Sequence, residues 1–135
     1  MILDTGVIYA NIDRRDDWHL TAAELLSTAP GPLRVPYLVI TEVCYLMGTR
    51  LGPVAEADFL AALACQEFEL VPLTTSDFAR AAELTRKYSD LPLGSVDASV
   101  IAVAERLRDG DIATTDRRHF YAVSEARTFT LYPAV

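Results

Sequence analysis

The stretch GSVDASVIAVAERL, residues 94–107, decides the fold of this chain. Its apolar side chains recur at spacings of three and four residues, which predicts a helix with one face on a core. Asp97 lies beside that apolar stripe in the first turn, so its carboxylate points toward the edge of the core. Two interpretations are open at this point. Asp97 either complements the helix dipole, with Gly94 or Ser95 at the N-cap, or belongs to a site that offsets a buried charge.

The rest of the chain alternates short apolar runs with helical patterns. Strands are expected at 1–4, 33–35, 68–72, 112–115 and 129–132, and helices at 18–28, 36–50, 54–65, 74–87 and 116–121, with a helical turn after Asp4. We place the N-cap of the 74–87 helix at Thr75 or Ser76, and Pro36 in the first turn of its helix. This alternation predicts an α/β fold, a three-layer α/β/α sandwich with a short, mostly parallel central sheet. We expect one domain over residues 1–135.

Composition narrows the classes of protein. With 51% hydrophobic and 23% charged residues, the chain is typical of a globular domain. It has no apolar run of about 18 residues, so we expect no membrane span. The N-terminal residues carry no basic region followed by an apolar one, so we expect no secretory signal and a cytoplasmic location.

The charge balance argues against a broad basic surface for nucleic acid. The net charge is −7, from 12 basic and 19 acidic residues, and every basic residue but Lys87 is an arginine. Arg14, Arg15, Arg117 and Arg118 form two local pairs that could contact phosphate, although solvated pairs are the simpler interpretation. The aromatic residues that could stack on bases are better explained as core packing; they are Trp18, Tyr88, Phe120 and Tyr121.

Cysteine and histidine give no sign of a zinc site. Cys44 and Cys65 stand singly in apolar helical contexts, so both are expected as small buried hydrophobes. His19 and His119 are isolated in the sequence, which makes a zinc site improbable.

Four acidic residues fall at one edge of the predicted sheet. Asp4 and Asp116 each follow a strand directly, and ligands of parallel sheets bind beyond the carboxyl ends of the strands. Asp97 begins a helix whose N-terminus faces the same edge, and Glu42 flanks the apolar face of an earlier helix. Because four carboxylates on one rim repel one another, we expect a divalent cation among them.

Each acid also has a simpler interpretation. Asp4 could open a turn before Gly6, Asp116 could cap the short helix after it, and Glu42 could be a solvated helix residue. It is the joint placement of the four acids that favours a site.

The donor set predicts the chemistry of the ion. Carboxylate oxygens without cysteine or histidine suit Mg²⁺ or Mn²⁺ rather than zinc. Such an ion can activate a water and stabilise charge on a phosphate, which fits hydrolysis of a phosphodiester. Thr5 and Thr115, beside Asp4 and Asp116, could orient ligands or a water.

These residues make the chain similar to a known family. Segments 1–5, 36–43, 94–98 and 112–120 resemble, in order and spacing, the PIN-domain ribonucleases, in particular the VapC toxins of bacterial toxin–antitoxin pairs. The resemblance spans essentially the whole chain and implies a PIN-like fold. It also implies a metal-dependent endoribonuclease that cleaves structured cellular RNA and arrests translation.

The resemblance implies roles for the acids and for partners. Asp4 and Asp97 would be the principal Mg²⁺ ligands, Asp116 a further metal-binding acid, and Glu42 a fourth that holds a water or a second ion. A VapB-type antitoxin would cover the active-site groove. Such toxins form homodimers or toxin–antitoxin hetero-oligomers, and promoter DNA is bound only through the antitoxin.

Other classes fit the sequence less well. A haloacid dehalogenase phosphatase needs a second Asp where this chain has Gly6, and a receiver domain needs a late lysine, whereas Lys87 has the wrong context. A non-catalytic PIN-fold interaction module would be expected to lose one or more acids, and all four are present.

Overall fold

A parallel sheet forms the centre of the fold. The structure, a computed structural model, describes residues 1–134. Five strands pair in the order β3-β2-β1-β4-β5, and each neighbouring pair is parallel. The strands are β1 (Ile2–Leu3), β2 (Arg34–Pro36), β3 (Glu69–Val71), β4 (Asp111–Ala113) and β5 (Thr130–Tyr132). The prediction of a short parallel sheet is confirmed, as is the prediction that the last strand lies at an edge.

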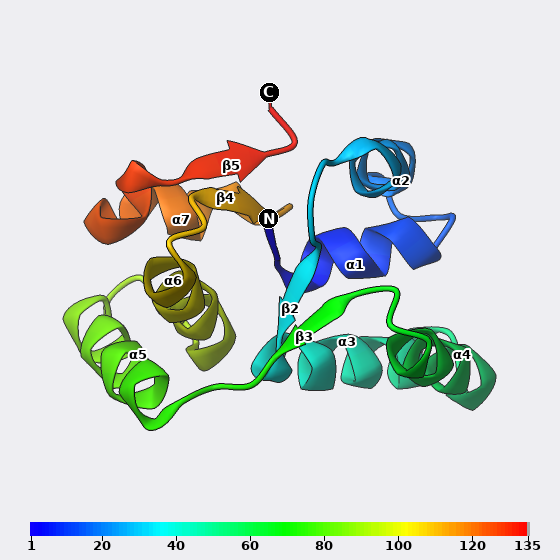
Figure 1. The fold of residues 1–135 in the computed structure, drawn as a ribbon, viewed down its shortest axis with the longest axis horizontal. Coiled ribbons are helices and arrows are strands. Elements are labelled where there is room, and N and C mark those ends of the chain that lie inside the picture. Colours follow the sequence, from blue (N-terminus) through cyan, green and yellow to red (C-terminus); the bar gives the residue numbers. More distant parts are fainter. Residues whose placement is uncertain (135) are drawn as a thin grey trace.

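Helices complete a three-layer sandwich, as predicted. They are α1 (Thr5–Ile12), α2 (His19–Thr28), α3 (Tyr37–Arg50), α4 (Pro53–Ala64), α5 (Thr75–Lys87), α6 (Ser95–Leu107), α7 (Arg117–Ala122) and the 3-10 helix η1 (Ser124–Thr128). Helices α5 and α6 lie on one side of the sheet and α1 and α2 on the other (Figure 1). Helix α3 contacts both α1 and α6, so it joins the two sides.

Helix α6 is buried more completely than its apolar stripe predicts. All residues from Ala98 to Ala104 are buried, because α6 packs against α5, α3, β1 and β2. Ser99 lies within this run, and its hydroxyl donates a hydrogen bond of 2.6 Å to the carbonyl of Val96. This bond satisfies the buried hydroxyl, so a polar residue is tolerated at the centre of the core.

Two helix starts differ from the predictions. Thr74, rather than Thr75 or Ser76, caps α5, because its hydroxyl accepts from the Asp77 N–H while the Asp77 carboxylate accepts from the Thr74 N–H. This reciprocal pair is a capping box. Pro36 is the last residue of β2 and the N-cap of α3, so it precedes the helix instead of entering its first turn.

The expectation for the cysteines was wrong. Both are free thiols; Cys65 is exposed and Cys44 is only partly buried. Cys65 is the C-cap of α4, where the chain leaves the core, so the apolar helix before it did not determine its burial.

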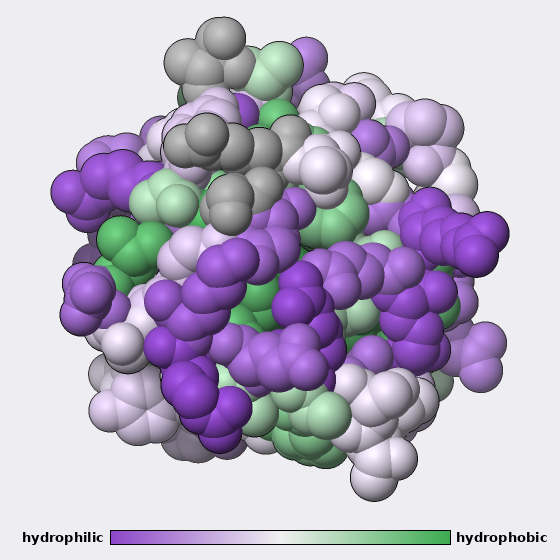
Figure 2. Space-filling model, turned by 90° about the vertical axis from the view of Figure 1, so that its left-hand side faces the viewer, coloured by the Kyte–Doolittle hydropathy of each residue, from purple (hydrophilic) through white to green (hydrophobic). Residues whose placement is uncertain are grey.

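The outer face over α5 and α7 is mostly hydrophilic, with small apolar areas between polar side chains (Figure 2). Arg80 binds Glu105 and Glu83 there, and Lys87 binds Glu125 at 2.6 Å. Arg80 and Lys87 are therefore paired with acids. No helix within residues 1–134 is both long and apolar enough to cross a membrane.

Candidate metal centre

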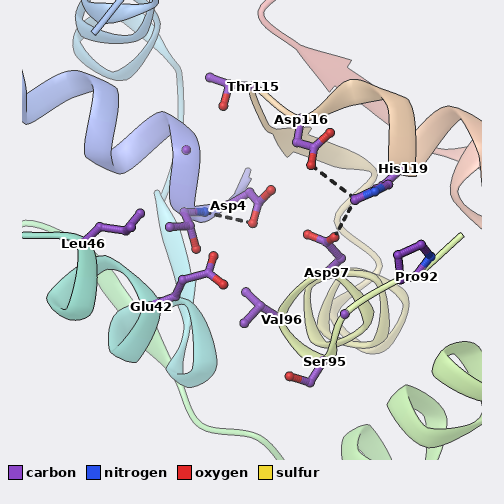
Figure 3. Close-up of a pocket in the computed structure, with 13 residues that line it drawn as sticks. Asp4, Glu42, Leu46, Pro92, Ser95, Val96, Asp97, Thr115, Asp116 and His119 are labelled. Atoms are coloured by element: carbon purple, nitrogen blue, oxygen red, sulfur yellow. Dashed lines mark hydrogen bonds and ion pairs between the residues drawn. The ribbon is translucent and has the colours of Figure 1, made fainter. Parts of the chain in front are cut away.

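The sheet brings the predicted acids to one place. Asp4 follows β1 and Asp116 lies three residues beyond β4; because these strands are paired neighbours, their carboxyl ends meet. Asp97 is in the first turn of α6, and Glu42 extends from α3. All four line one pocket of about 430 Å³ and face one another across it (Figure 3). The structure thus places together the four side chains that the sequence predicted to converge.

Asp4 is the most buried of the four acids, with 5% of its surface exposed. Its carboxylate accepts hydrogen bonds from the Thr5 N–H at 2.8 Å and from the Thr114 hydroxyl at 2.9 Å. Burial, then the negative charge of Asp97, raises the pKa of Asp4 from 3.8 to about 7, against the opposing effect of the two hydrogen bonds. Glu42 adds a smaller repulsion, so a charged Asp4 needs a nearby cation.

Asp97 is coupled to every other acidic group of the pocket. Burial raises its pKa most; His119 opposes this shift, while the charges of Asp116 and Glu42 add to it. Asp4 in turn feels the charge of Asp97. The four carboxylates therefore form one electrostatic unit rather than four separate surface charges.

His119 is part of this unit, contrary to the expectation that it is isolated. Its Nδ1 lies 3.3 Å from Asp97 Oδ2 and 3.2 Å from Asp116 Oδ2. Asp116 occupies the N-cap position of α7 without a side-chain capping bond, so it does not act as the helix cap that its position suggested. Asp97, Asp116 and His119 each offer one ligand atom within 4.8 Å of the others. In the sequence, His119 stands three residues after Asp116, and residues at this spacing on a helix are neighbours.

Threonines surround the acids. Thr114, which sequence reasoning did not select, donates to Asp4 and accepts from the Asp116 N–H at 3.1 Å. Thr5 lines the pocket, and its buried hydroxyl has no hydrogen-bond partner among the described residues. Thr115 also lines the pocket and packs against Gly6, since a Cβ on residue 6 would lie 2.0 Å from the Thr115 hydroxyl.

The two predicted arginine pairs lie outside the lining of the pocket. Arg117 donates to the carbonyls of Leu131 and Pro133 and so connects α7 to β5. Arg14, Arg15 and Arg118 are exposed. In the part of the chain that the structure describes, none of these four arginines lines the pocket.

The aromatic candidates divide between core and surface. Phe120 is buried, and Trp18 and Tyr88 pack against the core, as predicted. Tyr121 does not follow this prediction: it is half-exposed and lies under the guanidinium of Arg117.

Comparison with known proteins identifies the family. Residues 1–126 match the PIN domain family. The chain is 35% identical over 123 residues to Ribonuclease VapC26 of Mycobacterium tuberculosis, with 91% of each chain covered. It therefore belongs to the PIN domain family, as a VapC-type member.

Solved structures share the fold. The VapC20 toxin of Mycobacterium tuberculosis, described as cleaving the sarcin–ricin loop, has a TM-score of 0.83 at 21% identity, with 90% of this chain and 93% of that chain covered. A toxin–antitoxin complex from Klebsiella pneumoniae has a TM-score of 0.70 at 18% identity, with 92% of each chain covered. VapBC2 of Rickettsia felis, bound to a DNA fragment from its promoter, also has a TM-score of 0.70, at 15% identity and with 96% and 95% coverage.

Proposed function

We propose that this chain is a metal-dependent endoribonuclease that acts as the toxin of a toxin–antitoxin pair, with Asp4, Glu42, Asp97 and Asp116 as its active site. The observation that carries the proposal is the convergence of four coupled carboxylates on one pocket at the carboxyl edge of the sheet. The 35% identity to Ribonuclease VapC26 supports the reaction class. All four acids are present, which argues against a non-catalytic interaction module.

The pocket fits a divalent cation. Asp4, Asp97 and Asp116 would hold it, because a positive charge between them would offset the burial and the mutual repulsion that raise the pKa of Asp4 and Asp97. Taken alone, these carboxylate oxygens suit Mg²⁺, with Mn²⁺ as the alternative. The unpartnered hydroxyl of Thr5 is a further group that a bound ligand would satisfy.

The pocket side chains would have different roles in phosphodiester hydrolysis. When bound, the ion supplies a positive charge that stabilises the phosphate and lowers the pKa of water. Glu42 is exposed at the pocket rim, so it is placed to orient the attacking water and accept its proton. The buried Thr5 hydroxyl would bond to a ligand held among the acids, and Thr114 keeps the Asp4 carboxylate in position.

The similarity to toxin–antitoxin proteins also indicates a protein partner. Several structures of this fold are toxin–antitoxin complexes, so we infer that a VapB-type antitoxin covers the pocket of this chain, in a homodimer or hetero-oligomer. Promoter DNA would be bound through the antitoxin, and an RNA substrate implies a cytoplasmic location.

We further infer that residues 1–135 are a single PIN domain, since β5 lies beyond the matched residues yet pairs with β4.

The test uses purified chain freed of antitoxin and incubated with total RNA in Mg²⁺, Mn²⁺ or EDTA. We expect discrete cleavage with metal and none with EDTA. Asp4→Asn and Asp97→Asn should lose at least a hundredfold in rate, since each removes a ligand. Asp58→Asn, an exposed acid on α4, is the matched control and should cleave like wild type. Folded wild-type chain that cleaves no RNA with either metal would overturn the proposal.

A further inference from the structure

One side chain of the pocket is unlike the four acids. His119, the third residue of α7, lines the pocket, and its ring lies between Asp97 and Asp116 (Figure 3). Its two neighbours are the carboxylates of Asp97, in α6, and of Asp116, the residue that precedes α7. A nitrogen donor therefore stands where a purely oxygen-based ion site would hold only carboxylates.

The two contacts of His119 are long for charge-assisted hydrogen bonds. The Nδ1 separations of 3.3 Å to Asp97 and 3.2 Å to Asp116 exceed the roughly 2.7–2.9 Å of charge-assisted N–H···O bonds. One ring nitrogen carries at most one hydrogen, so it cannot serve both carboxylates with good geometry. A single hydrogen bond therefore accounts for one of the two contacts but not for the other.

The separations do match those between ligands of one ion. Two ligands at right angles in an octahedral site, each about 2.1–2.3 Å from the ion, lie about 3.0–3.2 Å apart. The Nδ1–Oδ2 separations lie at the upper end of this range or just above it, and all three ligand atoms lie within 4.8 Å of one another. Asp97, Asp116 and His119 could therefore each direct one ligand atom toward a single ion.

We propose that His119 ligates the active-site ion through Nδ1 and makes the site prefer Mn²⁺ over Mg²⁺. Mg²⁺ takes oxygen ligands and holds its water tightly, whereas imidazole nitrogen favours the transition metals. The inference rests on the proposed function, because it assumes that Asp97 and Asp116 hold an ion.

Pulsed electron paramagnetic resonance of the Mn²⁺-loaded full chain, without RNA, tests the ligand directly. We expect modulation from one directly bound ¹⁴N nucleus in wild type. It should vanish in His119→Gln and persist in His19→Gln. His19 is the matched control, because it is the other histidine of the chain and its ring contacts the Ala10 carbonyl at 2.7 Å.

Calorimetric titration tests the selectivity with the same three proteins. His119→Gln should lower the Mn²⁺ affinity at least tenfold and change the Mg²⁺ affinity less than threefold, because Gln removes the nitrogen ligand but no carboxylate. Circular dichroism should show that both variants are folded.

The outcomes separate the two proposals. Mn²⁺ bound without ¹⁴N modulation, or equal losses for Mn²⁺ and Mg²⁺, would overturn the role of His119 and leave the ribonuclease proposal standing. If the wild-type chain binds neither ion, both the role of His119 and the ribonuclease proposal are overturned. Asp97→Asn would then give the same titration as wild type.

Discussion

Thr114 donates a hydrogen bond of 2.9 Å from its hydroxyl to the Asp4 carboxylate, across the β1–β4 pair. The same hydroxyl accepts the backbone N–H of Asp116 at 3.1 Å. One fully buried threonine therefore fixes two of the four acids relative to each other. Since the bond favours the charged form of Asp4, it also keeps the pKa of that carboxyl from rising further.

Thr114→Val should weaken metal binding about tenfold, a typical loss when a group that orients a ligand is removed. The substitution keeps the shape but leaves Asp4 with one donor fewer and the Asp116 N–H without an acceptor. Calorimetric titration with Mn²⁺ measures the effect. Thr114→Ser keeps the hydroxyl and is the matched control; an equal loss in both variants would assign the effect to packing.

Asp4→Asn should stabilise the metal-free protein at neutral pH. The pKa of Asp4 is about 7 in the folded chain, against an ordinary 3.8, so the unfolded chain ionises first as pH rises. The free energy of unfolding of wild type therefore decreases by about 1 kcal/mol for each pH unit between about 4 and 7. Asn does not ionise, so the variant does not show this decrease.

Urea denaturation in EDTA at pH 5 and pH 8 measures the difference. We expect the advantage of Asp4→Asn over wild type to be larger at pH 8, and to disappear when Mn²⁺ is added. Asp58→Asn, which replaces an exposed acid outside the pocket, is the matched control. An advantage that is the same at both pH values would contradict the assignment to Asp4.

The sheet explains why the four acids could be predicted. Asp4 and Asp116 follow strands, and parallel strands bring their carboxyl ends to one edge whatever their exact length. The observed β4 ends at Ala113 rather than at residue 115, yet Asp116 still reaches the pocket. The position of Asp97 followed from helical periodicity, which is a strong signal in a helix of 13 residues.

His119 and Thr114 were missed for different reasons. The direction of the His119 ring depends on where the short helix α7 begins and on its packing, neither of which a pattern over six residues determines. The sequence does carry a signal for Thr114: it stands two residues before Asp116, and residues two apart along a strand share a face. Cys65 was misjudged because its burial depends on where α4 ends.

Gly6→Ala should destabilise the chain through Thr115. A Cβ on residue 6 would lie 2.0 Å from the Thr115 hydroxyl and 3.3 Å from its Cβ, so the Thr115 side chain must move. We expect a loss of about 1–3 kcal/mol in the free energy of unfolding, the usual cost of overpacking. Thr115→Ala in the same chain should restore most of it, and thermal denaturation of the double-mutant cycle measures the coupling.

Gly110→Ala is the control for that cycle. No heavy atom lies within 4 Å of where its Cβ would be, so the substitution should change stability little. A loss in Gly6→Ala that Thr115→Ala fails to reverse would place the conflict elsewhere in the backbone.

Arg106→Leu should destabilise the chain by about 2–3 kcal/mol at pH 7, below the full cost of breaking a buried pair because Arg106 is about a third exposed. Its guanidinium binds Asp77, which is 3% exposed, at 2.9 Å. Burial alone would raise the pKa of Asp77, but Arg106 and the Thr74 N–H outweigh it and lower that pKa below 3.8.

The sign of the pH dependence follows from that lowered pKa. The pair stabilises the fold above the ordinary pKa of an aspartate and loses this contribution as pH falls through the lower, folded value. The gap between wild type and Arg106→Leu in urea denaturation should therefore narrow from pH 7 to pH 3. Arg86→Leu, an exposed arginine of α5, should cost little at either pH. A gap that stays constant would mean that Arg106 stabilises the α5–α6 contact by packing rather than by its charge.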